Sequence, residues 1–438
     1  MVIDGGRFAR QVSAPPRYVS LKEGQLGISV AEFADEVRAF LDHNAVRRAH
    51  GAARSWGHGS DEVAIFRRQR YARRGPEMVA VREWQRTRFE NRLGSITGPT
   101  AFGGRELSRL HEMAYDEIES EYDVPDTSDL RIVGLSLVAP TVLAHGTEEQ
   151  LETFLRPLYR GDLVACQLFS EPGAGSDLAG LRTRAQRVDA GWIVNGQKVW
   201  TSVAHCADVG ELLCRTDSRL PKHAGITAFL VDMDSAGVEV RPLRQMTGAA
   251  EFNEVFFTDV YIPDSRRLGP VGAGWKVAMT TLLNERSTVG SDPSISAESA
   301  LNIAWLTSLL DATGKRLDPV TRRRLAELYV SRSTTDSLNA RMLRTLISGG
   351  TPGPEASVAK LMNTANVTTA AHFVSEVLGP ALIADNGDWG TFAWNELLLS
   401  TPALRLVGGT DEIMKNILAE RVLGLPREAA APSRSGNN

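Results

Sequence analysis

The sequence predicts an α+β protein with a helical N-terminal domain, a β-barrel-like middle domain and a C-terminal four-helix bundle. Apolar residues recur at three- and four-residue spacing in the first 160 residues and again after residue 275, which is typical of amphipathic helices. In between, short apolar runs alternate with turn residues, which is typical of strands. We therefore expect domains at 1–162, 163–271 and 272–428, followed by a disordered tail at 429–438.

The first domain is predicted to be helical from its apolar stripes. Val30, Phe33, Val37 and Phe40 follow helical spacing and share one face. Later in this domain, the segment 67–92 is crowded with arginines. Charge runs usually lie on solvated faces, so we interpret this segment as an exposed helical surface, with a ligand-binding patch as the alternative.

The middle and C-terminal domains differ in the period of their apolar residues. Four runs between turn residues predict strands, at 191–196, 224–232, 238–242 and 251–262. Pro263 and three following glycines mark the return to helix. From Trp275 to about Leu425 long helical stripes dominate, and helices of this length suit an antiparallel bundle.

Bulk composition excludes several classes of protein. The chain has 438 residues, 42% of them hydrophobic and 23% charged, which suits a globular protein with more than one core. A net charge of −4 offers no basic surface for nucleic acid. No apolar run has the length of a signal-peptide core or a membrane span, and the three cysteines lack metal-ligand spacing. We expect a cytoplasmic protein that binds neither nucleic acid nor membrane and holds no metal.

Two segments carry most of the functional information. The run 167–177, Gln-Leu-Phe-Ser-Glu-Pro-Gly-Ala-Gly-Ser-Asp, is a short strand that enters a turn whose backbone N–H groups can approach an anionic or carbonyl-rich ligand. The run 196–202, Gly-Gln-Lys-Val-Trp-Thr-Ser, predicts a strand that presents one indole and two hydroxyls. Trp200 could supply the flat surface that a flavin ring requires, and Ser170, Thr201 and Ser202 could supply hydrogen-bond donors.

Together with Gly408-Gly-Thr-Asp-Glu412, these segments resemble the flavin and thioester site of the acyl-CoA dehydrogenase family, in the family's order. The resemblance covers roughly residues 89–427. It implies FAD as cofactor, held by Gln167, Phe169, Ser170, Gly175, Ser176, Trp200, Thr201, Ser202, Thr410, Asp411 and Glu412. It implies that Ser176, Arg286 and Gly409 contact an acyl-CoA substrate.

The catalytic base is predicted at Glu285. Most members resembling this chain carry a glutamate where Gly408 stands, whereas a subgroup that includes isovaleryl-CoA and long-chain acyl-CoA dehydrogenases carries it in a Glu-Arg pair on the first helix after the β-domain, which Glu285-Arg286 matches. Independently, Glu285 continues an apolar helical stripe through Ala278 and Leu282. Burial would raise its pKa toward the working pH of a general base. The alternative is a structural carboxylate paired with an arginine of another helix.

The neighbouring polar residues have two interpretations each. By resemblance Arg286 reaches the nucleotide end of CoA, where an arginine suits phosphate; otherwise it is a surface arginine. Asp411 and Glu412 are acidic groups near the flavin in the resemblance. They also occupy the start of a helix, where carboxylates commonly cap.

Two segments depart from the family pattern. The usual Arg-x-x-Phe-Gly, which lends an arginine to a neighbouring subunit's FAD, has no match in 307–324, where only Lys315 and Arg316 could replace it. Glu376-Val-Leu-Gly-Pro380 stands where Gln-x-x-Gly-Gly is expected. These departures put the cross-subunit half of the flavin site in question.

The reaction implied by the resemblance is α,β-dehydrogenation of an acyl-CoA thioester in fatty acid or lipid metabolism. Glu285 would remove the α-proton, FAD would accept the β-hydrogen as hydride, and an electron-transfer flavoprotein would accept the electrons. A homodimer or homotetramer formed through the C-terminal bundle is expected, with a hetero-oligomer as the alternative. The rival functions are a flavin oxidase or tailoring enzyme on the same scaffold, and a non-catalytic partner subunit of a hetero-oligomeric dehydrogenase.

Overall fold

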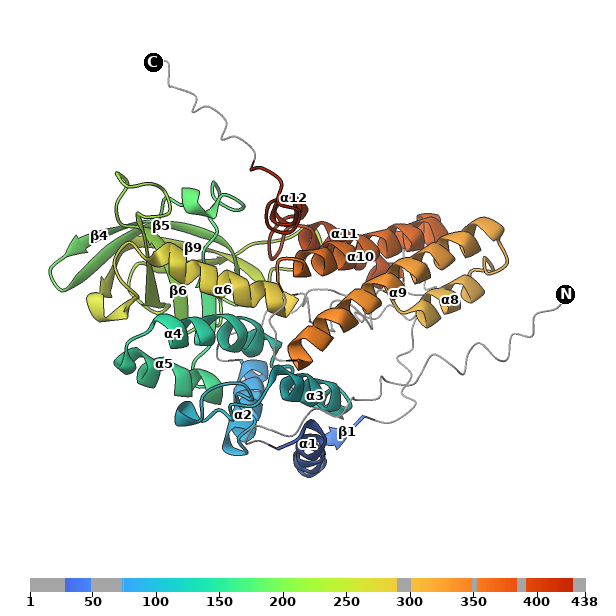
Figure 1. The fold of residues 1–438 in the computed structure, drawn as a ribbon, viewed down its shortest axis with the longest axis horizontal. Helices are drawn as coiled ribbons and strands as arrows, with labels where there is room; N and C mark the ends of the chain where they lie inside the picture. The colour runs from blue at the N-terminus through green and yellow to red at the C-terminus, as the bar shows by residue number, and fades with distance from the viewer. Residues whose placement is uncertain are drawn as a thin grey trace, which may run out of the picture.

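The computed structural model describes residues 28–48, 73, 75–289, 301–348, 353–383 and 391–427. It confirms the predicted order of a helical part, a β part and a second helical part. Figure 1 shows the sheet at one end of the molecule, the C-terminal helices at the other end, and the N-terminal helices below both. The predicted tail at 429–438 lies outside the described residues.

The N-terminal part consists of helices joined by short connections. Its elements are α1 (Val30–Asn44), β1 (Val46–Arg47), α2 (Pro76–Glu90), η2 (Thr100–Phe102), α3 (Arg109–Glu119), β2 (Tyr122–Asp123), η3 (Leu130–Val138), α4 (Ala139–His145) and α5 (Glu148–Arg160). The first helix begins with a reciprocal cap, because Ser29 and Glu32 each satisfy a backbone N–H of the other. The widened π-helical turns of η3 run directly into α4, where Pro140 has no N–H to donate.

Most of the described arginines in the arginine-rich segment do not form a solvated face, although Arg92 at its end is exposed. Arg88 is 2% exposed, and Arg86 pairs with Asp162 at 2.6 Å. Arg73 and Arg82 both bind the carboxylate of Asp208, at 2.7 and 2.8 Å. The interpretation as an exposed surface was therefore wrong for these residues, because their partners come from distant parts of the chain. Most of segment 67–74 lies outside the described residues.

The middle part is one eight-stranded sheet. Its elements are β3 (Ala165–Leu168), η4 (Leu178–Gly180), β4 (Arg184–Val188), β5 (Gly191–Ser202), β6 (Val209–Arg215), β7 (Ile226–Asp232), β8 (Val238–Pro242), β9 (Phe252–Pro263), η5 (Asp264–Arg266) and β10 (Arg267–Leu268). The strands pair in the open order β10-β7-β6-β4-β5-β9-β8, and β3 pairs with β6 in parallel. The predicted β domain is confirmed, although its strands form an open order rather than a closed barrel.

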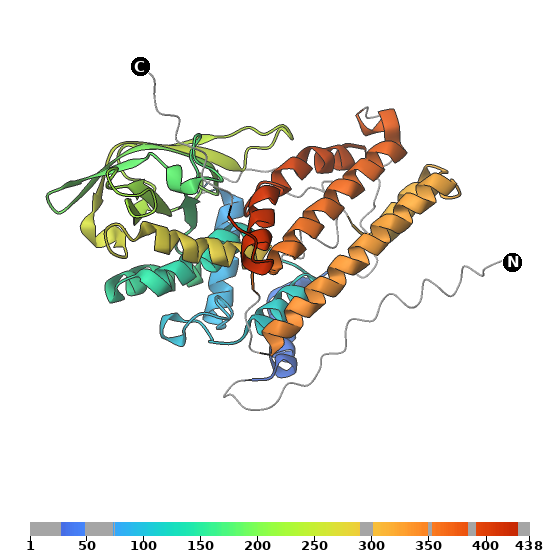
Figure 2. The same ribbon diagram turned by 45° about the horizontal axis from the view of Figure 1, so that its top comes forward.

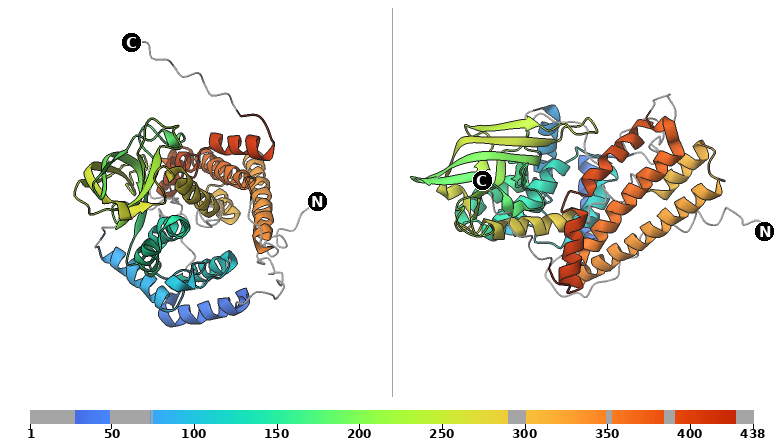
Figure 3. Two further views of the ribbon diagram at one scale, coloured as in Figure 1. Left: turned by 60° about the vertical axis from the view of Figure 1, so that its left-hand side comes forward. Right: turned by 90° about the horizontal axis from the view of Figure 1, so that it is seen from above.

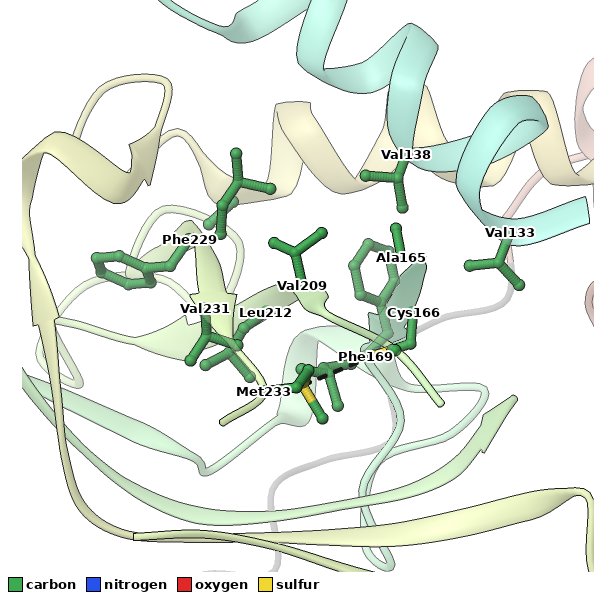
Figure 4. Close-up of a cluster of buried hydrophobic side chains, with 14 of the residues drawn as sticks. Val133, Val138, Ala165, Cys166, Phe169, Val209, Leu212, Phe229, Val231 and Met233 are labelled. Carbon is green, nitrogen blue, oxygen red and sulfur yellow. Dashed lines mark hydrogen bonds between the residues drawn. The ribbon is translucent and has the colours of Figure 1, made fainter. Parts of the chain in front are cut away.

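One hydrophobic core joins the N-terminal helices to the sheet. Val133 of η3 and Val138 at the start of α4 point toward Ala165, Phe169 and Val209 on the sheet side, as Figure 4 shows. Burial of this apolar area stabilises the contact at about 25 cal/mol for each Å² removed from water. The first two parts of the chain are therefore not independently packed.

The C-terminal part is helical, and its first helix packs differently from the others. Its elements are α6 (Gly274–Val289), α8 (Ile303–Ala312), α9 (Pro319–Ile347), α10 (Ala356–Leu378), η6 (Gly379–Leu382), α11 (Thr391–Leu404), α12 (Asp411–Ile417) and η7 (Leu418–Val422). Val277 and Ala278 of α6 belong to the core of the sheet. The later helices form a second core around Leu306, Val374 and Trp394. Figures 2 and 3 show α6 against the sheet, and α9, α10 and α11 packed as a group beyond it.

Among the described residues, no helix is long and apolar enough to span a bilayer. Within the same ranges, no three histidine, cysteine or carboxylate side chains gather as metal ligands would.

Candidate active site

The two informative segments lie side by side in the middle sheet. The backbone N–H of Val199 on β5 donates to the carbonyl oxygen of Ser170, which follows β3, at 2.9 Å. The ammonium of Lys198 donates to the carbonyl oxygen of Phe169 at 3.0 Å and to Glu171 Oε1 at 2.8 Å. These bonds place the turn at 170–177 next to the end of β5, as the resemblance implies.

A buried ion pair fixes that turn. Glu171 also accepts from the backbone N–H groups of Arg182, at 2.6 Å, and Thr183, at 2.9 Å. Burial opposes the charged form of Glu171, but Lys198 and these N–H groups outweigh it and hold the pKa of the carboxyl below its usual value. The turn is therefore rigid where it leaves β3. Sequence analysis missed Lys198, although a lysine between apolar strand residues was a signal of a buried partner.

Trp200 presents its indole to the outside of β5. The pairing of β5 with β9 shifts register between Lys198 and Thr201, and Trp200 adopts a φ of 61° at this bulge. A bulge re-aims the side chain that it contains. The indole is 57% exposed and packs edge-on against Phe252, with 5.9 Å between ring centroids. A large apolar ring this exposed, on a strained backbone, provides a flat surface for a planar ligand.

Two polar atoms beside Trp200 fit a ligand with hydrogen-bonding edges. Thr201 Oγ1 and Asn253 Oδ1 are buried, and neither has a hydrogen-bond partner among the described residues. Buried polar atoms nearly always have partners, so such a pair indicates a place for a ligand group. The amide of Asn253 donates to the Thr201 carbonyl oxygen at 2.9 Å, which holds both residues in place. The residues present therefore fit the polar edge of a flavin. Sequence analysis missed Asn253, which carries no motif.

The remaining predicted cofactor residues of the two segments differ in exposure. Gln167, Ser170 and Ser202 are half-buried, whereas Gly175 and Ser176 are exposed at the turn. The side chain of Phe169 is 4% exposed and packs in the core, so a ligand would meet only its backbone. Any contact of Phe169 with the cofactor would therefore come from its backbone.

Glu285 lies on α6, the helix that packs on the sheet. The most buried positions of α6 are Val277, Ala278 and Thr281, and Glu285 follows Thr281 on the same face, half-buried. The predicted placement of this carboxylate on the packed face is thus consistent with the structure. Arg286 follows in the same helix, and its side chain lies outside the described part of the chain.

The third segment begins α12 and is held by α10. Gly408 and Gly409 have φ values of 66° and 98°, which favour glycine and account for the lack of a side chain at 408. Thr410 caps the helix by accepting from the N–H of Ile413 at 3.2 Å. Lys360 of α10 donates to the carbonyl oxygen of Gly409 at 2.7 Å.

The two acidic residues of this segment have structural positions. Asp411 is 8% exposed and pairs with Arg405 at 2.6 Å. Glu412 is exposed in the first turn, where its interactions with the backbone and Thr410 lower the pKa of its carboxyl. Of the two interpretations given for these residues, the structure favours capping and pairing at a helix start.

The departures from the family pattern are engaged within the chain itself. Lys315 donates to the carbonyl oxygen of Val377, and Arg316 pairs with Asp311 at 2.6 Å. Glu376 forms an ion pair with Arg324. The cations proposed as replacements for the cross-subunit arginine therefore already have partners here.

A cavity of about 830 Å³ lies elsewhere on the sheet. β4, β6 and the segment before α6 line it, with Arg184, Arg187, Arg215 and Trp192 among its residues. Arg187 lies near Asp264, and Arg215 donates to the carbonyl oxygen of Ala179. None of the predicted flavin or base residues lines this cavity, so the hydrogen bonds described above, and not its volume, define the candidate site.

Comparison with known families agrees with the segments and the fold. The N-terminal, middle and C-terminal domain models of acyl-CoA dehydrogenase match residues 60–162, 166–260 and 272–423. The chain belongs to the acyl-CoA dehydrogenase family. It is an oxidoreductase that catalyses the dehydrogenation of an acyl-CoA. Members of this family typically bind FAD.

Individual relatives support the assignment. The chain is 35% identical to acyl-CoA dehydrogenase IpdE1 of Mycobacterium tuberculosis over 404 residues, which are 91% of this chain and 99% of IpdE1. It is 43% identical to acyl-CoA dehydrogenase FadE34 of the same organism over 290 residues, 66% of this chain but only 39% of FadE34.

Solved structures show the same architecture. The Tcur3481-Tcur3483 steroid ACAD superimposes with a TM-score of 0.72 at 25% identity, covering 92% of this chain and 100% of that one. The ChsE4-ChsE5 complex from Mycobacterium tuberculosis gives 0.67 at 26% identity, with the same coverage.

Proposed function

We propose that this acyl-CoA dehydrogenase holds FAD against β5 and that Glu285 is the base that removes the α-proton of the acyl thioester. The observation that carries the proposal is the position of the two alternative base sites. Glu285 lies half-buried on the packed face of α6, whereas Gly408 offers no side chain and has a backbone that favours glycine. Glu285 is therefore the carboxylate that the chain provides for this step.

The residues around β5 would hold the cofactor. Trp200 provides the flat surface, and Thr201 and Asn253 provide the polar atoms described above. Ser170 and Ser202, which are half-buried, would provide further hydrogen-bond donors. FAD, when bound, supplies the chemistry of accepting the β-hydrogen as hydride. Backbone N–H groups of the turn at 173–177 would bind the pyrophosphate or the thioester, because two glycines leave that backbone open.

The substrate would lie between the flavin surface and α6. Ser176 on the exposed turn, Gly409 and Arg286 are proposed to contact the acyl-CoA. A base on one side and a flavin on the other make removal of the proton and of the hydride geometrically compatible. An electron-transfer flavoprotein is the proposed electron acceptor, and a flavin oxidase that reduces oxygen is the alternative. A cytoplasmic location is also proposed.

The oligomeric state is the second open part of the proposal. A homodimer or homotetramer through the C-terminal helices is the first candidate. The engaged side chains of Lys315, Arg316 and Glu376 favour the alternative, a hetero-oligomer whose partner completes the flavin site. The similar ChsE4-ChsE5 structure is a complex of two named components, which supports testing this arrangement.

The test is anaerobic reduction of the flavin by a panel of acyl-CoA thioesters, from short linear to steroid-derived. Glu285→Gln is expected to keep FAD and to slow reduction by at least a thousandfold, which corresponds to about 4 kcal/mol in the barrier. Glu254→Gln, which changes a carboxylate of β9 bonded to Gln197, is the matched control and should reduce at the parent rate. Reduction of Glu285→Gln at the parent rate would show that the base is another group. A folded protein that takes up no FAD would refute both enzymatic functions, and only the role of a non-catalytic partner subunit would remain.

A further inference from the structure

A carboxyl group is fully buried between the sheet and α6. Glu211, in the middle of β6, is 0% exposed. Its Oε1 lies 2.7 Å from Oγ1 of Thr281 on α6, in a hydrogen bond. Its Oε2 has no hydrogen-bond partner among the described residues. A buried carboxylate normally requires a cation or several N–H donors, and Glu211 has neither in its contacts.

The hydrogen bonds around Thr281 determine where the protons lie. Thr141 on α4 donates to the carbonyl oxygen of Leu137 at 2.8 Å, and its Oγ1 lies 3.0 Å from Oγ1 of Thr281. Each hydroxyl has one proton to donate. The single proton of Thr281 has three acceptors within reach: Glu211 Oε1 at 2.7 Å, Thr141 Oγ1 at 3.0 Å and the carbonyl oxygen of Val277 at 3.4 Å. Donated over the shortest of these distances, it is the one hydrogen bond that the carboxyl of Glu211 receives, which is too little to stabilise a fully buried charge.

The electrostatics agree with this shortage of donors. Burial raises the pKa of Glu211 to about 8, and the Thr281 hydroxyl offsets only part of that effect. Titratable groups on the surrounding elements are Cys166 on β3, Cys214 and Arg215 on β6, Asp232 at the end of β7, His145 on α4, and Lys276, Glu285 and Arg286 on α6. None of these contributes to the shift, and burial also raises the pKa of both thiols.

The position of Glu211 connects the two halves of the proposed site. In the parallel pairing of β3 and β6, Glu211 lies opposite Gln167, three residues before Ser170. Its partner Thr281 lies one helical turn before Glu285 on the same face of α6. A change in this bond therefore moves the base-bearing turn of the helix relative to the strand that leads to the flavin turn.

We propose that Glu211, in its neutral form, is a positioning residue that holds α6 against the β3–β6 strand pair and so sets the place of Glu285. This inference rests on the proposed role of Glu285. Ionisation of Glu211 would place an unpaired charge between the sheet and α6, and the cost of burying that charge would favour a looser contact that admits water. Glu211 touches neither substrate nor cofactor in this role.

The decisive experiment follows flavin reduction in the FAD-loaded protein against pH, with the most active thioester of the panel. In the parent, the rate is expected to fall by about tenfold between pH 8 and pH 9.5, as Glu211 ionises. Glu211→Gln keeps an acceptor oxygen for the Thr281 hydroxyl and cannot ionise, so this variant should retain most of the rate at pH 7 and lose the alkaline decrease. Thr280→Val, which removes the neighbouring hydroxyl bonded to His145, is the matched control and should keep the alkaline decrease.

A second readout does not depend on turnover. Hydrogen–deuterium exchange in peptides of α6, corrected for intrinsic rates, should increase between pH 7 and pH 9.5 in the parent and stay constant in Glu211→Gln. Thr281→Val should show the faster exchange at both pH values, which covers the case in which Glu211→Gln fails to fold. An alkaline decrease that persists in Glu211→Gln, or exchange in α6 that is the same in every variant, would overturn the inference. Failure of Glu285→Gln to slow reduction would refute the proposed base, while the exchange data would still decide the role of Glu211.

Discussion

Two buried glutamates of the same sheet have opposite surroundings. Glu171, at the turn after β3, receives an ammonium group and two backbone N–H groups. Glu211, on β6, receives one threonine hydroxyl. The pKa of Glu171 is lowered, whereas that of Glu211 is raised to about 8. Burial favours the neutral form of both carboxyls, and the difference shows that close donors decide whether that effect is outweighed.

The two glutamates also hold different parts of the site in place, one through an ion pair and the other through a neutral hydrogen bond. The ion pair of Glu171 and Lys198 fixes the turn after β3 through opposite charges, although burial lowers the pKa of Lys198. The neutral bond of Glu211 fixes the helix of the base and fails when the proton leaves. The two sides of the proposed site are thus held by interactions with different sensitivities.

The largest effect on this comparison is expected from breaking the ion pair. Lys198→Met leaves the buried carboxylate of Glu171 without its cation, which should lower the free energy of unfolding by about 3 to 5 kcal/mol. Urea unfolding at pH 7 measures this loss. In the double variant Glu171→Gln/Lys198→Met no charge is left unpaired, so part of the stability should return. A single variant as stable as the parent would show that the pair is not required to hold the turn.

The next effect concerns the pH dependence of stability. The folded protein retains the proton of Glu211 up to about pH 8, whereas an unfolded glutamate releases it near its ordinary value of 4.5. The folded state therefore binds more protons between these values, and this contribution to stability falls as pH rises, by about 1.4 kcal/mol per pH unit. Between pH 5.5 and 7.5 the parent should lose about 3 kcal/mol relative to Glu211→Gln in urea unfolding. Equal pH dependence of the two proteins would mean that Glu211 is charged when folded.

A smaller effect is expected from the buried hydroxyl that has no partner. Thr201→Val removes this polar atom at nearly constant volume, so the FAD-free protein should gain up to about 1 kcal/mol in the free energy of unfolding. The same variant should bind FAD more weakly, as measured by equilibrium dialysis. Unchanged FAD affinity would show that Thr201 Oγ1 does not contact the cofactor. Weaker FAD binding by Thr201→Val would show that the buried Thr201 hydroxyl serves ligand binding, in contrast to the buried carboxyl of Glu211, which serves packing.

The smallest effect is expected at the C-terminal loop. Asp411 pairs with Arg405, whose side chain is half exposed, so solvent weakens the pair. Asp411→Asn should change the free energy of unfolding by no more than about 1 kcal/mol. Thermal unfolding of the FAD-free protein, compared with that of Glu412→Gln, provides the measurement. A loss as large as that of Lys198→Met would show that this pair is as strongly desolvated as the pair in the sheet.

The order of the domains could be predicted because the period of the apolar residues changes twice along the chain. The pairing of the first two site segments followed from motifs that fold locally into a turn and a strand. The partners of charged side chains were not predictable, because they are distant in sequence. Arg82 meets Asp208 across 126 residues, and local charge density gave no sign of it. The sequence did not show which face of the short strand before Phe169 is buried, because so few residues give no clear period.

Glu211 shows what a closer examination of the sequence could have found. It is the single charged residue between Val209 and Leu213, in a run that reads as a strand buried on both faces. A carboxylate in such a run indicates a protonated or paired group. Its partner on α6 could not be inferred, because no local pattern predicts which helix covers which strand.

The packing of α6 on the sheet bears on how this protein can be re-engineered. The domain models place α6 in the C-terminal domain, yet Val277 and Ala278 share the core of the sheet and the N-terminal helices. A chimaera that imports the C-terminal domain of a relative would therefore replace one wall of that core together with Glu285, the proposed base. A fusion point after α6 would instead exchange the bundle, and with it any subunit contacts that the bundle makes, while the recipient keeps its own α6.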